Sequence, residues 1–427
     1  MVSMKKADRN PVYGAKLSSV VPASVTGDYK VRHELADQDL ALKLHYIKGV
    51  YVFREDAVRG LSIYDLKKPM FCWLDLFPAA SGRIRRGEDD SNDSFPGRPF
   101  VKCNDSGVRI VEARCELTVD EWLSGTEEGL HSPDTLAYDQ VLGPDLGFSP
   151  LVYVQFTWFK CGGMSLGLSW AHLLGDFFSA SSFINLWALL LSDHVPPSSL
   201  HMPPPPTPTD SPSPFKPVAP VGDLWIAPSC PMMGTLSLRV TPEQLERLHA
   251  LSGLVRPRDL SAFELISAVL WKSVSRVRAD RGTRSAVVCE RRRAPRGDAF
   301  ESPVNAMAFG RAEADFSVAE AEVEEILGVI RKRKGGGWAL EHPTGDYVAY
   351  GAELTFVDLE GLEIGGVEIN GEKAVFASYG VGGVGEGGAV VVLPEVAGKG
   401  MGRRVNVIMP EAELGKVRDE LTVTWGL

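Results

Sequence analysis

The sequence predicts an α/β protein with largely mixed β-sheets. Short apolar runs of strand type alternate with segments that carry helix-start signals, in both halves of the chain. The chain has 427 residues, of which 44% are hydrophobic and 23% charged. This is an ordinary globular composition, and the length is sufficient for two domains with separate cores.

The N-terminal half mixes predicted helices and strands. Residues 37–46 read as a helix, and residues 49–53 read as a strand that follows it. Further along, Leu151–Phe159 is a long run of β-type residues. A Gly-Gly turn follows it, and then comes a second alternating run that ends at Ala171.

A proline-rich stretch lies near the midpoint of the chain. Eleven of the 25 residues from Pro196 to Pro220 are proline, so this stretch is expected to run extended and exposed. It could be a ligand for another protein's groove, but its position favours a linker. We therefore predict an N-terminal domain over 1–195, a crossover linker over 196–222 and a C-terminal domain over 223–427.

The C-terminal half carries three Ser/Thr-x-x-Glu/Gln patterns that predict helix starts, at Thr241, Ser261 and Ser317. Predicted strands cover 235–240, 286–289 and 389–393. Residues 361–402 are rich in glycine. No Lys-Ser/Thr pair follows these glycines, so tight turns between strands are favoured over a phosphate-binding loop.

Charge and cysteine content exclude several classes of function. The net charge is −10, and the basic clusters at 291–293 and 331–334 are short, so no nucleic-acid partner is predicted. The six cysteines lack zinc-site spacing; we expect reduced thiols, no metal site and no cofactor. We find no secretory signal and no apolar run of transmembrane length. Any membrane association must therefore come through a partner or a surface patch.

The His-x-x-x-Asp pattern is the main candidate for chemistry, and it occurs three times, starting at His33, His172 and His342. Only His172 follows a long β-type run, which would deliver it on a rigid strand as a general base. His342 stands in a turn-like segment, and His33 in a polar one. The local pattern alone leaves open whether His172 is a base or a histidine packed in the core.

Several landmarks in one order resemble the plant BAHD acyltransferase family across nearly the whole chain. They are Pro78–Arg83, Cys103–Val108, Cys161–Gly163, His172–Asp176 and Ser261–Trp271. The resemblance implies two similar domains like those of chloramphenicol acetyltransferase, joined by a long crossover with a channel between them. It also implies transfer of an acyl group from acyl-CoA to an alcohol or amine.

The same resemblance assigns roles to three residues. His172 falls on the family's general base. Asp176 falls on a structural, orienting aspartate that pairs with an arginine, and Arg291 is the best candidate for that arginine. The sequence assigns no CoA-binding residues.

One departure from the family narrows the match. The family motif Asp-Phe-Gly-Trp-Gly is replaced here by Glu368–Glu372, which leaves catalytic turnover open. Together with the intact His172–Asp176 pair, this replacement resembles the eceriferum-two-like branch, the plant cuticular-wax proteins. Further matching segments are Leu17–Val25, Leu42–Tyr46, Val141–Leu146 and Leu168–His172.

The resemblance leaves two main hypotheses. In the favoured one, the chain assists very-long-chain fatty acid elongation beside an elongase condensing enzyme, at the cytosolic face of the endoplasmic reticulum. In the other, it is an active acyltransferase with His172 as the base. A weaker third hypothesis is a scaffold that docks partners through its proline-rich crossover. We expect a monomer, cytoplasmic unless a partner recruits it, that handles acyl-CoA or an acyl chain.

Overall fold

The computed structural model describes most of the chain. The described residues are 10–28, 31–86, 98–139, 146–195, 197, 200, 231–252, 260–279, 283–291, 300, 302–335, 348–396 and 402–427. The prolines at 203–220, the Val141–Leu146 segment up to residue 145, and the His342 pattern lie outside them.

By its internal contacts the chain divides into two compact units. Unit 1 holds the described residues within Met1–Pro203, Gly297–Asn305 and Glu363–Gly382, and unit 2 holds the described remainder. The sequence-based domain boundaries at 195 and 223 stay a prediction. The structure adds that two stretches from the second half of the chain pack in unit 1.

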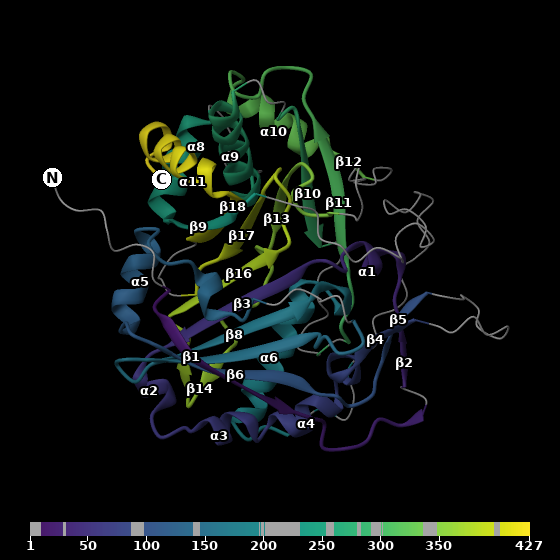
Figure 1. Ribbon diagram of the computed structural model, residues 1–427. Coiled ribbons are helices and arrows are strands. Elements are labelled where there is room, and N and C mark those ends of the chain that lie inside the picture. Colours follow the sequence, from purple (N-terminus) through teal and green to yellow (C-terminus); the bar gives the residue numbers. More distant parts are fainter. Residues whose placement is uncertain are drawn as a thin grey trace. The chain divides into compact units, whose positions relative to one another are not determined.

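Unit 1 is built on a six-stranded mixed sheet in which only β6 and β7 run parallel (Figure 1). Its strand order is β1 (Val12–Val20), β6 (Val108–Cys115), β7 (Val152–Phe159), β8 (Met164–Ala171), β3 (Tyr46–Phe53) and β16 (Phe376–Gly382). Two smaller sheets are β2 (Arg32–Glu34), β5 (Pro99–Lys102) and β4 (Arg83–Arg86), and the hairpin of β14 (Glu368–Ile369) and β15 (Glu372–Lys373).

The helices of unit 1 are mostly short. They are α1 (Asp37–Ala41), α2 (Glu55–Val58), α3 (Ile63–Lys67), α4 (Met70–Asp75), α5 (Val119–Glu127) and α6 (Phe177–Leu191), with short 3₁₀ segments η2 (Pro78–Ser81), η3 (Pro133–Leu136) and η4 (His172–Leu174). The longest, α6, packs its aromatic side chains against the sheet and α4. Phe183 stacks 3.8 Å from Trp73 and 4.9 Å from Trp170, ring centre to ring centre.

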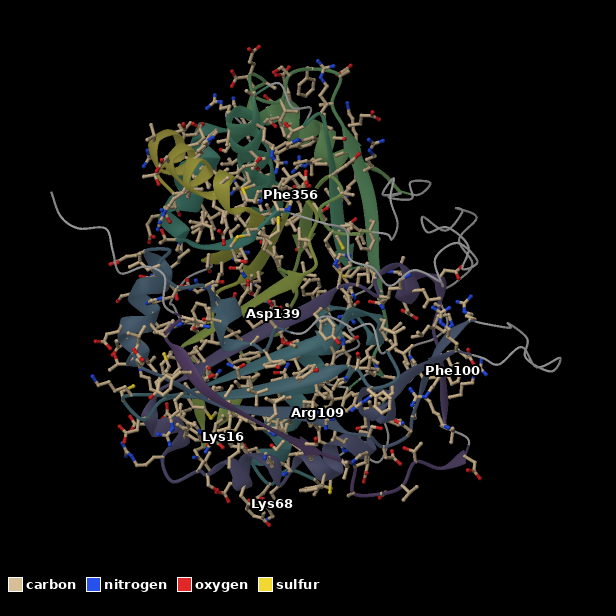
Figure 2. All side chains as sticks on the ribbon, in the orientation of Figure 1. Lys16, Lys68, Phe100, Arg109, Asp139 and Phe356 are labelled. Atoms are coloured by element: carbon tan, nitrogen blue, oxygen red, sulfur yellow. The ribbon has the colours of Figure 1, made fainter. Side chains whose placement is uncertain are left out.

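Unit 2 carries a seven-stranded mixed sheet, in which β13 pairs in parallel with both β10 and β17. Its order is β12 (Lys334–Gly335), β11 (Met307–Glu313), β10 (Ser285–Arg291), β13 (Leu354–Asp358), β17 (Ala389–Pro394), β18 (Arg403–Pro410) and β9 (Met233–Val240). The helical segments are α8 (Pro242–Leu251), α9 (Ala262–Arg278), α10 (Val323–Arg331), α11 (Glu411–Glu420) and η6 (Leu421–Trp425). Apolar residues of α9, among them Phe263 and Trp271, join Phe356 and two valines of β17, Val390 and Val392, in one core. Figure 2 labels Phe356 inside this unit.

The two mixed sheets confirm the predicted α/β class, while two local expectations are wrong. The helix expected over 37–46 ends at Ala41, and β3 already begins at Tyr46. Residues 40–53 are all buried, which suits a central strand better than a one-sided helix. The cap expected at Ser317 also fails. Helix α10 begins at Val323, where the N–H of Glu322 donates to the Glu325 side chain at 2.9 Å.

Among the described helices, none combines the length and the apolar character needed to cross a membrane.

Strand β8 runs straight into His172, and Gly167 in its middle lets it pass close to η3. A Cβ atom at Gly167 would lie 1.9 Å from the carbonyl oxygen of Leu136. We predict that Gly167→Ala lowers the free energy of unfolding by about 3 kcal/mol, because backbone must move to admit the methyl group. Urea denaturation measures this. Gly365→Ala is the matched control, since a Cβ there meets nothing within 4 Å. Equal stability of the two variants would contradict the close approach.

Candidate functional site

The turn that follows β8 carries both His172 and Asp176, and it is fixed from two sides. Trp170, near the end of β8, donates its indole Nε1–H to the carbonyl of Gly175 at 3.0 Å. Asp176 is the N-cap of α6, and its side chain accepts the N–H groups of Phe178 at 3.0 Å and Ser179 at 3.1 Å. Only 1% of Asp176 is exposed. The aspartate thus starts the helix directly after the histidine turn.

His172 is fully buried and lies beside a second buried histidine, His45. The backbone N–H of His172 donates to the carbonyl of His45 at 3.0 Å. The ring Nδ1 of His45 lies 3.1 Å from the carbonyl oxygen of Gly382. Because a carbonyl only accepts, the proton of neutral His45 sits on Nδ1. This hydrogen bond joins β3 to the end of β16.

Asn305 connects His172 to the half-buried carboxyl group of Asp39. Its Nδ2 donates to the carbonyl of His172 at 3.0 Å and to Asp39 Oδ1 at 2.7 Å. The other oxygen of Asp39 accepts the N–H of Ala36 at 2.7 Å, which closes the first turn of α1. The site in unit 1 therefore comprises His172, His45, Asn305 and Asp39, held by α1, β3 and η4.

Burial favours the neutral form of each of these groups. It therefore lowers the pKa values of the two histidines and raises the pKa of Asp39. Burial, with a further contribution from nearby His45, lowers the pKa of His172 to about 3. Burial lowers the pKa of His45 to about 4, although its bond to Gly382 opposes this. Burial raises the pKa of Asp39 to about 6, against the hydrogen bonds from Asn305 and Ala36. Both histidines are neutral at pH 7, and so each carries a lone pair but accepts a proton poorly.

The sequence predicted three site residues, and the structure places two of them in unit 1. His172 and Asp176 stand at the two ends of one turn. Arg291 is the last residue of β10 in unit 2, and its pairing with Asp176 stays a prediction. Of the other two His-x-x-x-Asp patterns, His33 lies on β2, which pairs with β5.

Sequence reasoning missed His45, Asp39 and Asn305. His45 stands among apolar residues at the start of a strand, which is a weak signal for a polar partner. Asn305 comes from a stretch 133 residues beyond His172, and no local pattern links the two. Among the described residues, no group of three or more His, Cys, Asp and Glu side chains is arranged to hold a metal ion.

The segment Glu368–Lys373, which the sequence analysis matched to the family's Asp-Phe-Gly-Trp-Gly position by resemblance, forms a tight hairpin. β14 and β15 are joined by Asn370 and Gly371, whose φ angles of 53° and 78° suit a two-residue turn of the type that favours Asn-Gly. Asn370 Nδ2 donates to the carbonyl of Ala57 on α2 at 2.9 Å. Ile369 is fully buried. The hairpin is thus an ordered part of unit 1, and its Asn-Gly pair is a local turn signal in the sequence.

Comparisons with known proteins agree with this fold. The model of the Transferase family matches residues 14–324. The chain belongs to this family, the BAHD acyltransferases. The predicted family is therefore confirmed.

The chain is 38% identical over 420 residues to the protein ECERIFERUM 26-like of Arabidopsis thaliana, covering 96% of this chain and 95% of the relative. It is 36% identical over 430 residues to ECERIFERUM 2 of the same plant, covering 97% and 98%. These matches confirm the eceriferum-two-like branch of the BAHD family.

Solved structures of similar fold include vinorine synthase, with a TM-score of 0.66 at 19% identity, covering 95% of this chain and 96% of that one. Another is TRI101 of F. sporotrichioides in complex with coenzyme A and T-2, with a TM-score of 0.65 at 12% identity, covering 92% and 97%. They confirm the fold of this BAHD protein.

The cap on α6 generates a test of Asp176. We predict that Asp176→Ala lowers the free energy of unfolding by about 1–2 kcal/mol through loss of the cap alone. Asp176→Asn keeps an oxygen that can accept the same N–H groups. If Asp176 also pairs with Arg291, Asp176→Asn should lower the free energy of unfolding nearly as much as Asp176→Ala. The reason is that the Arg291 guanidinium then loses its carboxylate partner. Thermal and urea unfolding measure both variants, and a wild-type result for Asn would count against the Arg291 pair.

The buried groups also fix how stability depends on pH. Each histidine has a folded pKa below its unfolded value of 6.5. The contribution of each histidine to the free energy of unfolding is fully present above pH 6.5. It is lost as the pH falls below 6.5, by about 1.4 kcal/mol per pH unit. Asp39 has a folded pKa of about 6 against 3.8 unfolded. Its contribution has the opposite sign, so the protein gains stability from Asp39 as the pH falls through 6.

We therefore predict opposite changes of slope in two variants between pH 6 and about 4. His45→Gln cannot take up the proton but can still donate to Gly382, so its stability should fall less steeply than that of the wild type, by about 1.4 kcal/mol per pH unit. Asp39→Asn removes the opposing group, so its stability should fall more steeply by a similar amount. Urea unfolding across this range is the measurement. Three parallel curves would refute the assignment.

Proposed function

We propose that this chain is a BAHD-fold accessory protein of cuticular wax biosynthesis. In this proposal it assists very-long-chain fatty acid elongation, beside an elongase condensing enzyme at the cytosolic face of the endoplasmic reticulum. The support is the similarity to ECERIFERUM proteins along nearly the whole chain. The likeness of the fold to TRI101, solved with coenzyme A, supports an acyl-CoA or acyl chain as the molecule that it handles.

The observation that carries the accessory role is the environment of His172. A general base works best when its pKa lies near the working pH. Full burial holds the pKa of His172 at about 3, several units below that range. A histidine in this state is well suited to packing against His45 and to binding Asn305 through its carbonyl. It is poorly suited to taking a proton from a hydroxyl or an amine.

The hairpin of β14 and β15 is a second line of support. It stands where the family carries its CoA-side motif, and it lacks that motif's tryptophan and two-glycine pattern. Its charged residues Glu372 and Lys373 are exposed and Glu368 is half-buried, while its buried Ile369 packs into unit 1. A segment rebuilt in this way is consistent with a fold retained for a purpose other than the original acyl transfer.

The second candidate function is an active acyltransferase. Its support is the intact turn, in which strand β8 delivers His172 and Asp176 holds the following helix. In this mechanism neutral His172 takes the proton of an acceptor hydroxyl or amine. The acceptor then attacks the thioester carbonyl, and the tetrahedral intermediate expels CoA as the thiolate. Binding of the acceptor would have to displace the packing around His172 and raise its pKa.

The two candidates differ in what they require of His172. We predict that His172→Asn supports chain extension as well as the wild type does when co-expressed with the condensing enzyme, read out as acyl-chain lengths. Asparagine keeps polarity and much of the volume but cannot act as the base. The matched control is His194→Asn, at an exposed histidine beyond α6. A loss of a hundredfold or more, with folding preserved, would falsify the accessory role, since general-base catalysis contributes about 10²–10⁴ in rate. Transfer of a labelled acyl group from CoA to an alcohol by the purified protein would also contradict it.

A further inference from the structure

Two strands of unit 1 bring three arginine side chains together. Arg83 and Arg85 stand two residues apart on β4 and therefore share one face of that strand. Nη1 of Arg83 donates to the carbonyl of Gly107 at 3.1 Å, and Arg109 follows two residues later on β6. We call these three arginines and Tyr153 the arginine cluster. Figure 2 labels Arg109 in unit 1.

Strand β7 adds Tyr153 to the arginine cluster. Tyr153 is the register partner of Arg109 where β6 and β7 run parallel. Its ring stacks on that of Tyr138, with 4.8 Å between the ring centres. Among the described residues its hydroxyl has no hydrogen-bond partner. Burial raises the pKa of Tyr153 to about 12, so the hydroxyl keeps its proton at neutral pH and can donate a hydrogen bond to an anion.

The arginines of the cluster donate to neutral acceptors and leave part of their hydrogen-bonding capacity unused. The acceptors are the carbonyl oxygens of Gly82, Ser106 and Gly107 for Arg83, those of Ile84 and Gly147 for Arg85, and the hydroxyl of Ser19 for Arg109. In the part of the chain that the structure describes, no ion pair involves any of the three. The Nε and Nη2 groups of Arg85 and Arg109 have no partner there, and both side chains are only half-buried. These N–H donors are therefore open to a ligand.

The carboxylates on neighbouring segments do not neutralise the arginine cluster. Asp105 accepts the N–H of Thr26 at 2.9 Å and also its hydroxyl. Asp139 pairs with Lys48 at 2.9 Å. Glu112 stands an odd number of residues after the cluster arginine of β6, so it lies on the opposite face of that strand. The positive charge of the cluster is therefore uncompensated within the described residues.

Arg83 shows the electrostatic cost of this arrangement. Only 3% of Arg83 is exposed. Burial lowers the pKa of its guanidinium to about 10; the charges of Arg109 and Arg85 also lower it, while Tyr153 and Tyr46 act in the opposite direction. Two cations therefore lie near enough to repel a third one that is shielded from water. An anion bound between Arg85 and Arg109 would offset that repulsion.

The donors of the arginine cluster favour a phosphate group over a carboxylate. Guanidinium groups bind phosphate oxygens in pairs, because the planar fork of N–H donors matches the spacing of those oxygens. A carboxylate brings one negative charge and two oxygens, whereas a phosphomonoester brings about two charges and three terminal oxygens. Three guanidinium groups and one phenolic hydroxyl are therefore used more fully by a phosphomonoester.

We propose that the arginine cluster of unit 1 is a binding site for a phosphomonoester group. The group would lie against Arg85 and Arg109, at the half-buried side of the cluster, and accept a hydrogen bond from Tyr153. Its carrier is either a free phosphate compound or the headgroup of a lipid such as phosphatidic acid. The inference goes beyond the proposed function and does not depend on it, since no step of chain extension enters the argument.

Isothermal titration calorimetry of the purified full chain tests the proposal at about pH 8, where a phosphomonoester is doubly charged. The probes are inorganic phosphate, dihexanoyl phosphatidic acid and, as a phosphodiester, dihexanoyl phosphatidylcholine. We expect one site that binds phosphatidylcholine about tenfold more weakly than phosphatidic acid, or weaker still. An affinity for inorganic phosphate that at least equals the affinity for phosphatidic acid identifies a free phosphate compound as the carrier. Tighter binding of phosphatidic acid identifies a lipid headgroup.

Substitutions in the arginine cluster show where the probes bind. Arg85→Gln and Arg109→Gln should each lower the affinity for phosphomonoesters about tenfold or more, and Tyr153→Phe about fivefold, because each change removes a hydrogen bond to a charged group. Arg83 is left intact, because its bonds to loop carbonyls also support the fold. The matched control is Arg114→Gln, at an exposed arginine on the opposite face of β6, which should bind like the wild type. Circular dichroism checks that every variant is folded.

Absence of binding by the wild type at millimolar probe, or wild-type affinity in the folded Arg85 and Arg109 variants, overturns the proposal. Binding of phosphatidylcholine as tight as that of phosphatidic acid overturns the assignment to a phosphomonoester. The loop between β4 and β5 lies outside the described residues and carries four acids, Glu88, Asp89, Asp90 and Asp93. If phosphate binds only after these four acids are replaced by their amides, the cluster serves that loop and the proposal is wrong.

Discussion

The cap that Asp176 places on α6 is the contact on which much of unit 1 depends. It fixes where α6 starts, and α6 carries the aromatic side chains that pack on Trp73 and Trp170. Trp170 in turn donates to the carbonyl just before Asp176. These contacts therefore link strand β8, the turn after it and helix α6 to one another, and His172 lies in that turn. A histidine held in this way keeps its position whether or not it takes part in chemistry.

The neighbourhood of His172 is held by contacts that do not require it to take part in chemistry. Neutral His45 and the amide of Asn305 lie beside it, and Asn305 links it to the Asp39 carboxyl, whose pKa is raised. All of them need partners once buried, since unpaired polar groups are costly in the interior. Loss of catalysis would not release these residues from that requirement. The presence of His172 and Asp176 therefore says less about activity than the motif suggests.

The sequence was sufficient for the family, the α/β class and the helix starts at Thr241 and Ser261. Those features rest on local capping chemistry, strand-type runs and motif order. It was not sufficient for the contacts of the site, because Asn305 reaches His172 and Gly382 reaches His45 from far along the chain. It also misplaced the end of α1, since residues buried on all sides show no helical or strand periodicity. The hairpin at Asn370-Gly371 could have been predicted, because Asn-Gly is a local signal for a two-residue turn.

Strand β16 is an edge strand of the six-stranded sheet in unit 1, and it comes from late in the sequence. It pairs with β3 along seven residues, from Phe376 to Gly382, although β3 is complete more than 300 residues earlier. During synthesis unit 1 cannot close its sheet until most of the chain has left the ribosome. In that interval β3 presents an open, apolar edge of the kind that invites misassembly. Contacts of such long sequence separation slow folding, so cellular yield of this protein should depend on chaperones. A C-terminal truncation that ends the chain before residue 382 would shorten β16. It should therefore destabilise the six-stranded sheet of unit 1.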